Sequence, residues 1–126
     1  MTTQAIETFL GIVKGRDAFE LLKLDTTLAP LSLTIELSVN TSLCAIRNFD
    51  QKYIKVRVRF VGVIMYQIYA LDQYPNERSL SSSFDKILDS QYLARYNEKG
   101  YYSLYALAAY DHVVEVAGRG LEIEQI

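Results

Sequence analysis

Strict alternation of hydrophobic and polar residues marks two segments of the chain. Residues 31–39, LSLTIELSV, carry an aliphatic residue at every odd position and a polar residue at every even one. Residues 53–60 repeat the pattern, with Lys55, Arg57 and Arg59 at polar positions. Because successive side chains of a β-strand point to opposite faces, both segments are predicted to be strands with one buried face.

The pattern changes along residues 61–71, where almost every position is apolar. Gly62 stands at the change, and a glycine inside a strand favours a bend or a bulge. We therefore expect one long strand over residues 53–71 that bends at Gly62. Its second half should be covered on both faces, because an antiparallel strand with one solvent-exposed face has alternating hydrophobic and polar residues.

Helical spacing of apolar residues occurs in two places. The stripes are formed by Ile6, Phe9, Leu10 and Val13, and by Phe84, Ile87, Leu88 and Tyr92. Intervals of three and four residues gather such side chains on one side of a helix. They predict an amphipathic N-terminal helix and a short helix over residues 84–92.

The fold predicted from these elements is α+β, with a single domain over residues 1–126. Further strands are expected at residues 19–26, 101–110, 113–116 and 121–126. Strands that follow one another without long crossover helices pair mainly antiparallel. We expect an N-terminal amphipathic helix packed on a curved, mainly antiparallel sheet or partly open barrel of about six strands. The short helix would be inserted before the last strands.

Tyrosine is concentrated in one part of the chain, with five of the ten tyrosines between residues 96 and 110. Neither alternating row of residues 101–110 contains a charge, so both faces of this strand should be covered. The cover could be the second layer of a sandwich, the short helix with the serine-rich loop over residues 72–83, or another polypeptide. The preferred interpretation places the tyrosine rings in the interior, with their hydroxyl groups at a rim.

Two functional interpretations of the tyrosines stay open beside the structural one. Tyrosine gives a large contact area at low entropic cost, which suits a protein interface. The candidate interaction residues are Tyr92, Tyr96, Tyr101 and Tyr105, together with the basic Lys55, Arg57 and Arg59. In the alternative, a small ligand occupies a barrel cavity. That cavity would be lined by Tyr66, Tyr69, Tyr102 and Tyr110.

Charge narrows the choice of partners. The net charge is −2 and the isoelectric point is near 5.4, whereas nucleic-acid-binding domains usually have a basic excess. The row of Lys55, Arg57 and Arg59 is interpreted as a salt-bridged surface ladder, ahead of an acidic protein partner or a nucleic acid. Its expected cross-strand partners are Glu36, Glu115, Glu122 and Glu124.

Few residues suggest catalytic or metal chemistry. The single cysteine, Cys44, is interpreted as a buried inert thiol, and Asp111 with His112 as a tight connection between strands. Asp85 and Asp89 would lie four residues apart on the short helix, as a solvated flank rather than a cation site. No cofactor and no metal are predicted, and an enzyme that uses His112 with carboxylates is the weakest hypothesis.

The C-terminal third, ILDSQYLARYNEKGYYSLYALAAYDHVVEVAGRGLEIE, resembles a group of small uncharacterised bacterial α+β proteins. Some of these proteins are immunity-protein-like, and the resemblance implies a class but no catalytic residues. The N-terminus has no basic leader or membrane span, so a cytoplasmic location is expected. The preferred hypothesis is a non-enzymatic protein that binds another protein or a second copy of itself, with an immunity-type inhibitor as the specific candidate. No nucleic acid and no membrane are expected as partners, and a small ligand is the alternative.

Overall fold

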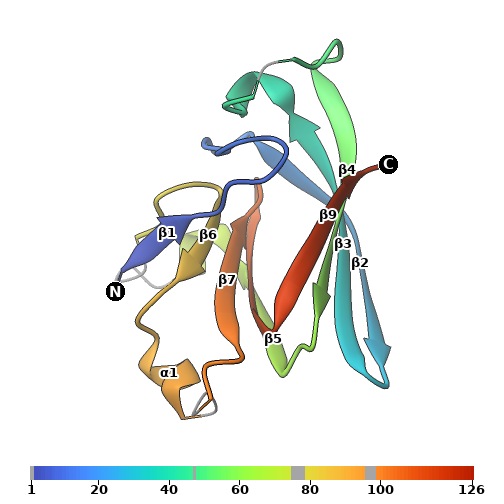
Figure 1. Cartoon of the computed structure of the whole chain (residues 1–126). Coiled ribbons are helices and arrows are strands. Elements are labelled where there is room, and N and C mark those ends of the chain that lie inside the picture. The colour runs from blue at the N-terminus through green and yellow to red at the C-terminus, as the bar shows by residue number, and fades with distance from the viewer. Residues whose placement is uncertain (1, 47, 75–78, 96–98) are drawn as a thin grey trace.

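In the part of the chain that the computed structural model describes, nine β-strands form two antiparallel sheets (Figure 1). The structure describes residues 2–46, 48–74, 79–95 and 99–126. Within these residues the single α-helix is four residues long. The strands pair antiparallel as expected, but the predicted α+β class with one curved sheet or partly open barrel is wrong.

The larger sheet has five strands. In spatial order they are β1 (Thr3–Ala5), β6 (Phe84–Ile87), β7 (Ser103–Ala108), β8 (His112–Gly118) and β5 (Met65–Ala70). A short 3-10 turn, η2 (Leu71–Gln73), follows β5, and the helix α1 (Gln91–Ala94) precedes β7. The strands β1 and β5 are therefore the edges of this sheet.

The smaller sheet has four strands. Their order is β2 (Phe19–Leu28), β3 (Leu31–Asn40), β4 (Tyr53–Val61) and β9 (Gly120–Gln125), and a 3-10 turn, η1 (Thr41–Leu43), follows β3. The predicted alternation in β3 and β4 is confirmed, because their aliphatic positions from residue 33 onward are buried. The register between β2 and β3 shifts at Leu22, which forms a bulge on the edge strand.

A bend in two neighbouring stretches of chain joins the sheets. β4 pairs with β9 in the smaller sheet, and their continuations β5 and β8 pair with each other in the larger one. Gly62, with φ of +60°, lies between β4 and β5, and Arg119 lies between β8 and β9. The N–H of Arg119 donates to the carbonyl of Val61 at 2.9 Å.

The bend predicted at Gly62 is confirmed, but the single strand predicted over residues 53–71 is wrong, because it is divided into β4 and β5 in different sheets. The expected cover on both faces of its second half is wrong as well, since β5 is an edge strand on which Gln67 and Ile68 are exposed.

A hydrophobic core fills the space between the two sheets. Phe60 of β4 meets Phe84 of β6 edge to face, with ring centroids 6.3 Å apart. The same ring lies 5.6 Å from Tyr105 of β7. The fully buried leucine, isoleucine and valine side chains of β3 complete this core from the smaller sheet.

The outer face of the five-stranded sheet is covered by the chain itself. The buried hydrophobic side chains on this face include Ile87, Leu104, Ala106 and Ala117. Leu93 of α1 packs over them together with Leu80, which precedes β6. The helix and the serine-rich loop therefore cover β7, whereas Ile68 on the edge strand β5 is half exposed.

Residues 6–15 do not form the predicted N-terminal helix. Gly11 has φ of +73°, and its N–H donates to the carbonyl of Thr8 in a tight turn. The carbonyls of residues 10 and 12 accept hydrogen bonds from residues 46 and 45 at 3.0 and 2.9 Å. Main-chain carbonyls that would accept hydrogen bonds within a helix accept them here from a second segment, residues 45 and 46.

Residues 84–92 begin as strand β6 and not as the predicted short helix. Asp85 pairs with Ala5 on one side and with Ala106 on the other. Pairing with two strands satisfies the backbone and buries the side chains, which an isolated helix of two turns cannot do. Helix is confined to α1, where the Oγ of Ser90 accepts a hydrogen bond from the N–H of Leu93 at 3.2 Å.

Candidate functional site

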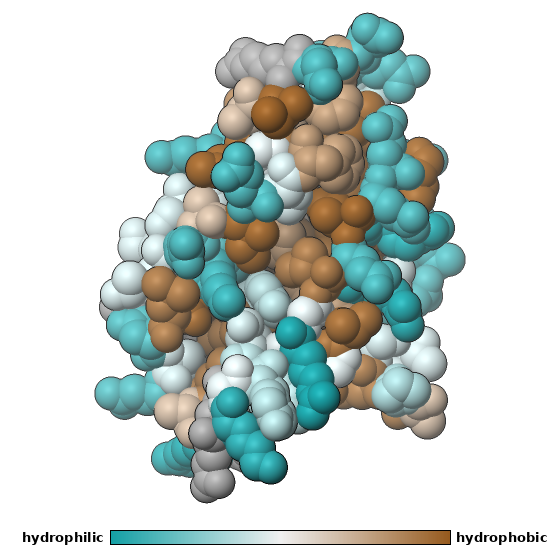
Figure 2. Space-filling view, in the orientation of Figure 1, coloured by the Kyte–Doolittle hydropathy of each residue, from teal (hydrophilic) through white to brown (hydrophobic). Residues whose placement is uncertain are grey.

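Four large apolar side chains, three exposed and one half-buried, lie on two neighbouring loops at one end of the two sheets. We call this group the end patch, and it consists of Phe9, Ile12, Ile46 and Phe49. The rings of Phe9 and Phe49 meet edge to face with centroids 6.3 Å apart. Phe9, Ile12 and Ile46 are 40, 43 and 40% exposed. Figure 2 shows hydrophobic residues near the top of the view, and others continue down the middle of the same face.

The end patch is held in place by contacts between two loops. Besides the main-chain bonds of residues 10–12 to residues 45 and 46, the N–H of Lys14 donates to the carbonyl of Leu43 at 3.2 Å. Gly11 permits the close approach, because a Cβ at this position would lie 2.9 Å from the Cβ of Ala45. Loops that a rigid scaffold fixes in this way are common carriers of binding sites.

Two polar hollows border the end patch. They have volumes of about 250 and 290 Å³, and both are lined by Phe49, Asp50 and Gln51. The Oγ1 of Thr41 donates to the carbonyl of Gln51 at 2.7 Å and fixes this loop. An apolar centre with a polar rim is the usual composition of a protein interface.

A third hollow, which we call the serine hollow, lies beside residues 14–16 and has a volume of about 340 Å³. It is lined by Lys14, Gly15, Arg16, Leu71, Leu80, Ser81, Ser82, Ser83, Ala108 and Ala109. The Oγ of Ser83 accepts from the N–H of Gly15 at 3.2 Å and lies 3.0 Å from its carbonyl, to which it donates. No local motif marks this hollow in the sequence, because its residues come from segments far apart in the chain.

The tyrosines predicted as interaction residues differ in their surroundings. Tyr105 is only 8% exposed and belongs to the core between the sheets. Tyr101 is exposed, and the guanidinium of Arg119 lies 5.0 Å from the centre of its ring. The side chain of Tyr92 and the whole of Tyr96 lie outside the described residues.

The tyrosines of the predicted ligand cavity are dispersed. Tyr66 packs against the core between the sheets, and Tyr102 packs on the outer face of the larger sheet. The ring of Tyr69 lies 5.3 Å from that of Tyr74, whereas Tyr110 is exposed. None of the four lines the serine hollow or the two hollows beside the end patch.

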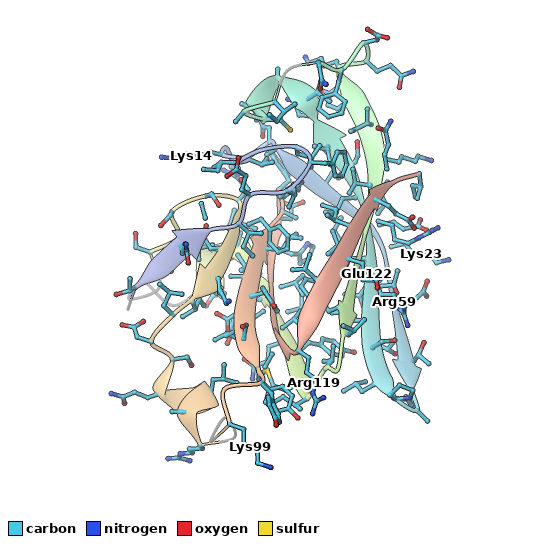
Figure 3. All side chains as sticks on the ribbon, in the orientation of Figure 1. Lys14, Lys23, Arg59, Lys99, Arg119 and Glu122 are labelled. Atoms are coloured by element: carbon cyan, nitrogen blue, oxygen red, sulfur yellow. The ribbon has the colours of Figure 1, made fainter. Side chains whose placement is uncertain are left out.

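The basic row lies on the outer face of the four-stranded sheet, where Figure 3 labels Arg59 and Glu122. It consists of Lys55, Arg57 and Arg59. Arg57 bridges two strands, at 3.3 Å from Glu36 and 3.1 Å from Glu124. Hydrogen bonds to Glu36 and then to Glu124 raise the pKa of Arg57 above its ordinary value. Arg59 lies 4.0 Å from Glu122, so the predicted cross-strand ladder is confirmed for both arginines.

Two carboxylates on the other sheet are buried, which the sequence pattern did not predict. Asp85 accepts hydrogen bonds from the N–H of Ser81 and the hydroxyl of Ser82. Glu115, expected as a partner of the basic row, instead accepts a hydrogen bond from the hydroxyl of Tyr74 at 2.6 Å. Ala106 separates the two acids in the sheet. Both acids therefore anchor the loop between β5 and β6, and Asp85 is not the solvated helix residue that was expected.

The remaining candidates show no assembled reactive group. Cys44 is buried as predicted, whereas His112 is exposed at the turn between β7 and β8. Asp89 is exposed and accepts a hydrogen bond from the N–H of Thr2 at 2.6 Å. Within the described ranges, no three His, Cys, Asp or Glu residues are grouped as a metal site would require. In the same ranges, no helix has the length and apolar character needed to span a membrane.

Sequence reasoning missed the end patch because Phe9 and Leu10 fit a helical stripe. The signal that argued against the helix is Gly11, since glycine inside a helix costs about 1 kcal/mol relative to alanine. Comparison with protein-family models, curated proteins and solved structures finds no match to this chain. The resemblance over residues 87–124 therefore stays a prediction.

Proposed function

We propose that this protein is a non-enzymatic binding protein that docks a second polypeptide on the end patch. The observation that carries the proposal is the exposure of Phe9, Ile12 and Ile46 together on loops that are fixed to each other. Single exposed apolar residues are normal on a protein surface, but several of them on two loops fixed to each other are typical of interaction sites. Burial of such area contributes roughly 25 cal/mol per Å² removed from water.

The chemistry of the end patch supports binding rather than catalysis. Its four side chains carry no acid, base or nucleophile. The adjoining hollows add Asp50, Gln51 and Lys52, which can form hydrogen bonds or ion pairs at a rim. This arrangement fits a partner with an apolar centre and polar surroundings. The immunity-type role stays a prediction from the resemblance alone.

The test compares Ile12→Asp with Leu28→Asp as a matched control. Leu28 is 82% exposed at the far end of β2, so both variants place a carboxylate on exposed surface. Affinity capture from the natural host, mass in solution and titration with the purified captured chain are measured for each. We expect the wild type and Leu28→Asp to bind one polypeptide stoichiometrically, and Ile12→Asp to bind it at least about tenfold more weakly.

Two results would contradict the proposal. One is a wild-type protein that neither self-associates nor captures a chain that binds again when purified. The other is a partner whose affinity is the same for Ile12→Asp and for the wild type. If the partner is a second copy, sedimentation of the wild type gives a dimer that Ile12→Asp dissociates.

A further inference from the structure

We propose that the serine hollow binds a carboxylate attached to a small apolar body. This inference is independent of the end patch. Two cationic residues, Lys14 and Arg16, line the hollow together with the apolar Leu71, Leu80 and Ala108. Its volume of about 340 Å³ lies at the lower end of the range for small-ligand sites, which is about 300–1,000 Å³.

The cationic segment is fixed before any ligand arrives. The hydroxyl of Ser83 bonds to both main-chain groups of Gly15, and the N–H of Ser83 donates to the carbonyl of Val13 at 2.8 Å. The guanidinium of Arg16 lies 4.8 Å from the ring centre of Tyr110, a cation–π contact that favours one position of the side chain. A preorganised site binds more tightly, because fewer of its side chains and loops must be ordered on binding.

The two cations have no anionic partner among the described residues. The ion pairs of the described chain involve Lys23, Arg57 and Arg59 on the other sheet. Asp85, the buried acid next to this loop, is held by Ser81 and Ser82. Asp17, which follows Arg16, is exposed and is the nearest competing charge in sequence. As far as the described residues go, an incoming carboxylate would therefore meet Lys14 and Arg16 without an ion-pair partner.

The apolar lining selects among anions. Leu71, Leu80, Ala108 and Ala109 offer no hydrogen bonds from their side chains, so a fully hydrated inorganic anion gains little inside the hollow. A carboxylate with an aliphatic group places its charge at Lys14 and Arg16 and its carbon atoms on this lining. A free carboxylic acid and the C-terminal residue of a peptide share this chemistry.

The test uses hexanoate and its uncharged analogue hexanamide in NMR titrations of the whole protein. For a ligand of about eight heavy atoms we expect a dissociation constant on the order of 1 mM. The amide signals that shift with hexanoate should be those of residues 14–16, 81–83, 108 and 109. Hexanamide, Lys14→Gln and Arg16→Gln should each weaken binding about five- to tenfold, because each removes one charge-assisted contact.

Lys99→Gln is the matched control, because Figure 3 places Lys99 at the opposite end of the molecule from Lys14. It should bind hexanoate as the wild type does. N-acetylglycyl-leucine and its C-terminal amide are then compared. Binding of the free peptide acid but not of hexanoate assigns the site to a chain terminus, and binding of hexanoate assigns it to free acids. Equal binding of hexanoate and hexanamide, shifts elsewhere on the surface, or no shifts with either acid would overturn the proposal.

Discussion

At Gly62 the chain passes from one sheet into the other, and the backbone there has φ of +60°. The side chain of Arg119 lies against this glycine, so that an added Cβ would meet its Cγ at 2.7 Å. Arg119 in turn extends over the rings of Tyr101 and Tyr102, at 5.0 and 5.7 Å. A residue with no side chain is needed here for two reasons, conformation and space.

Gly62→Ala is expected to lower the free energy of unfolding by about 2–3 kcal/mol, because it adds both left-handed strain and a clash. Gly100→Ala is the matched control. Gly100 also has a positive φ, of +70°, but no atom of the described residues lies within 4 Å of an added Cβ. This variant should lose only about 1 kcal/mol. Urea denaturation of both variants measures the difference in the free energy of unfolding. Equal losses of stability would show that the clash with Arg119 does not contribute.

Asp85, like Gly62, is a single residue that fixes the position of a longer segment. Its carboxylate is fully buried, and it holds Ser81 and Ser82 over the outer face of the five-stranded sheet. Hydrogen bonds to a charged group are worth more than those between neutral groups. Loss of this carboxylate should therefore loosen the loop that lines the serine hollow.

Asp85→Asn is expected to reduce the free energy of unfolding by about 2 kcal/mol, since it removes a charged acceptor and buries an amide donor in its place. Asp89→Asn, at an exposed carboxylate four residues away, should change the stability by less than about 0.5 kcal/mol. Thermal and urea denaturation distinguish the two. Similar values for the two variants would show that the buried carboxylate has no special role.

At the scale of elements, β7 and its neighbour β8 are the strands in the middle of the larger sheet, and both are buried on two faces. The inner face of β7 packs on Phe60, and its outer face packs under α1 and Leu80. The lack of charge in residues 101–110 correctly predicted this double cover. The alternation of residues 31–39 and 53–60 and the bend at Gly62 were also predictable, because they depend on local sequence. Glu36 and Glu124 were expected as partners of the basic row from their charge, whereas strand pairing places both of them beside Arg57.

Two elements that sequence reasoning got wrong have a local pattern that fits a helix. Residues 6–13 and 84–92 have helical spacing, but distant partners decide their conformation. Residues 45 and 46 bind the first segment, and β1 with β7 enclose the second. Such pairings join residues far apart in sequence, so the local spacing of hydrophobic residues does not predict them. The serine hollow is unpredictable for the same reason.

Hydrogen exchange should rank the strands by their position in the sheets. β7 has a neighbouring strand on each side and cover on each face, so its amides should exchange only through extensive unfolding. The edge strand β1, with three residues, should exchange orders of magnitude faster. Comparable protection of β1 and β7 would show that the edge is covered in solution.

At the scale of the whole molecule, one core connects the two sheets. Phe60 reaches from the smaller sheet to Phe84 and Tyr105 of the larger one. The bend at Gly62 and Arg119 also joins the sheets through the backbone. The sheets should therefore unfold together and not one after the other.

Phe60→Ala is expected to destabilise the protein by about 3–5 kcal/mol, because it leaves a cavity between the sheets. Phe9→Ala, at the exposed end patch, should cost about 1 kcal/mol or less. Circular dichroism and tyrosine fluorescence should give coincident unfolding curves for the wild type. Separate transitions would show that the sheets are independently stable.

The bulge at Leu22 has a further consequence for the molecule at high concentration. β2 is a ten-residue edge strand, and a flat unpaired strand of this length invites the same strand of another molecule. The extra residue, with the charged Lys23 and Asp25 beside it, interrupts that straight row of donors and acceptors. Deletion of Leu22 would restore the row, and solutions of the shortened protein would then be prone to fibrillar aggregation.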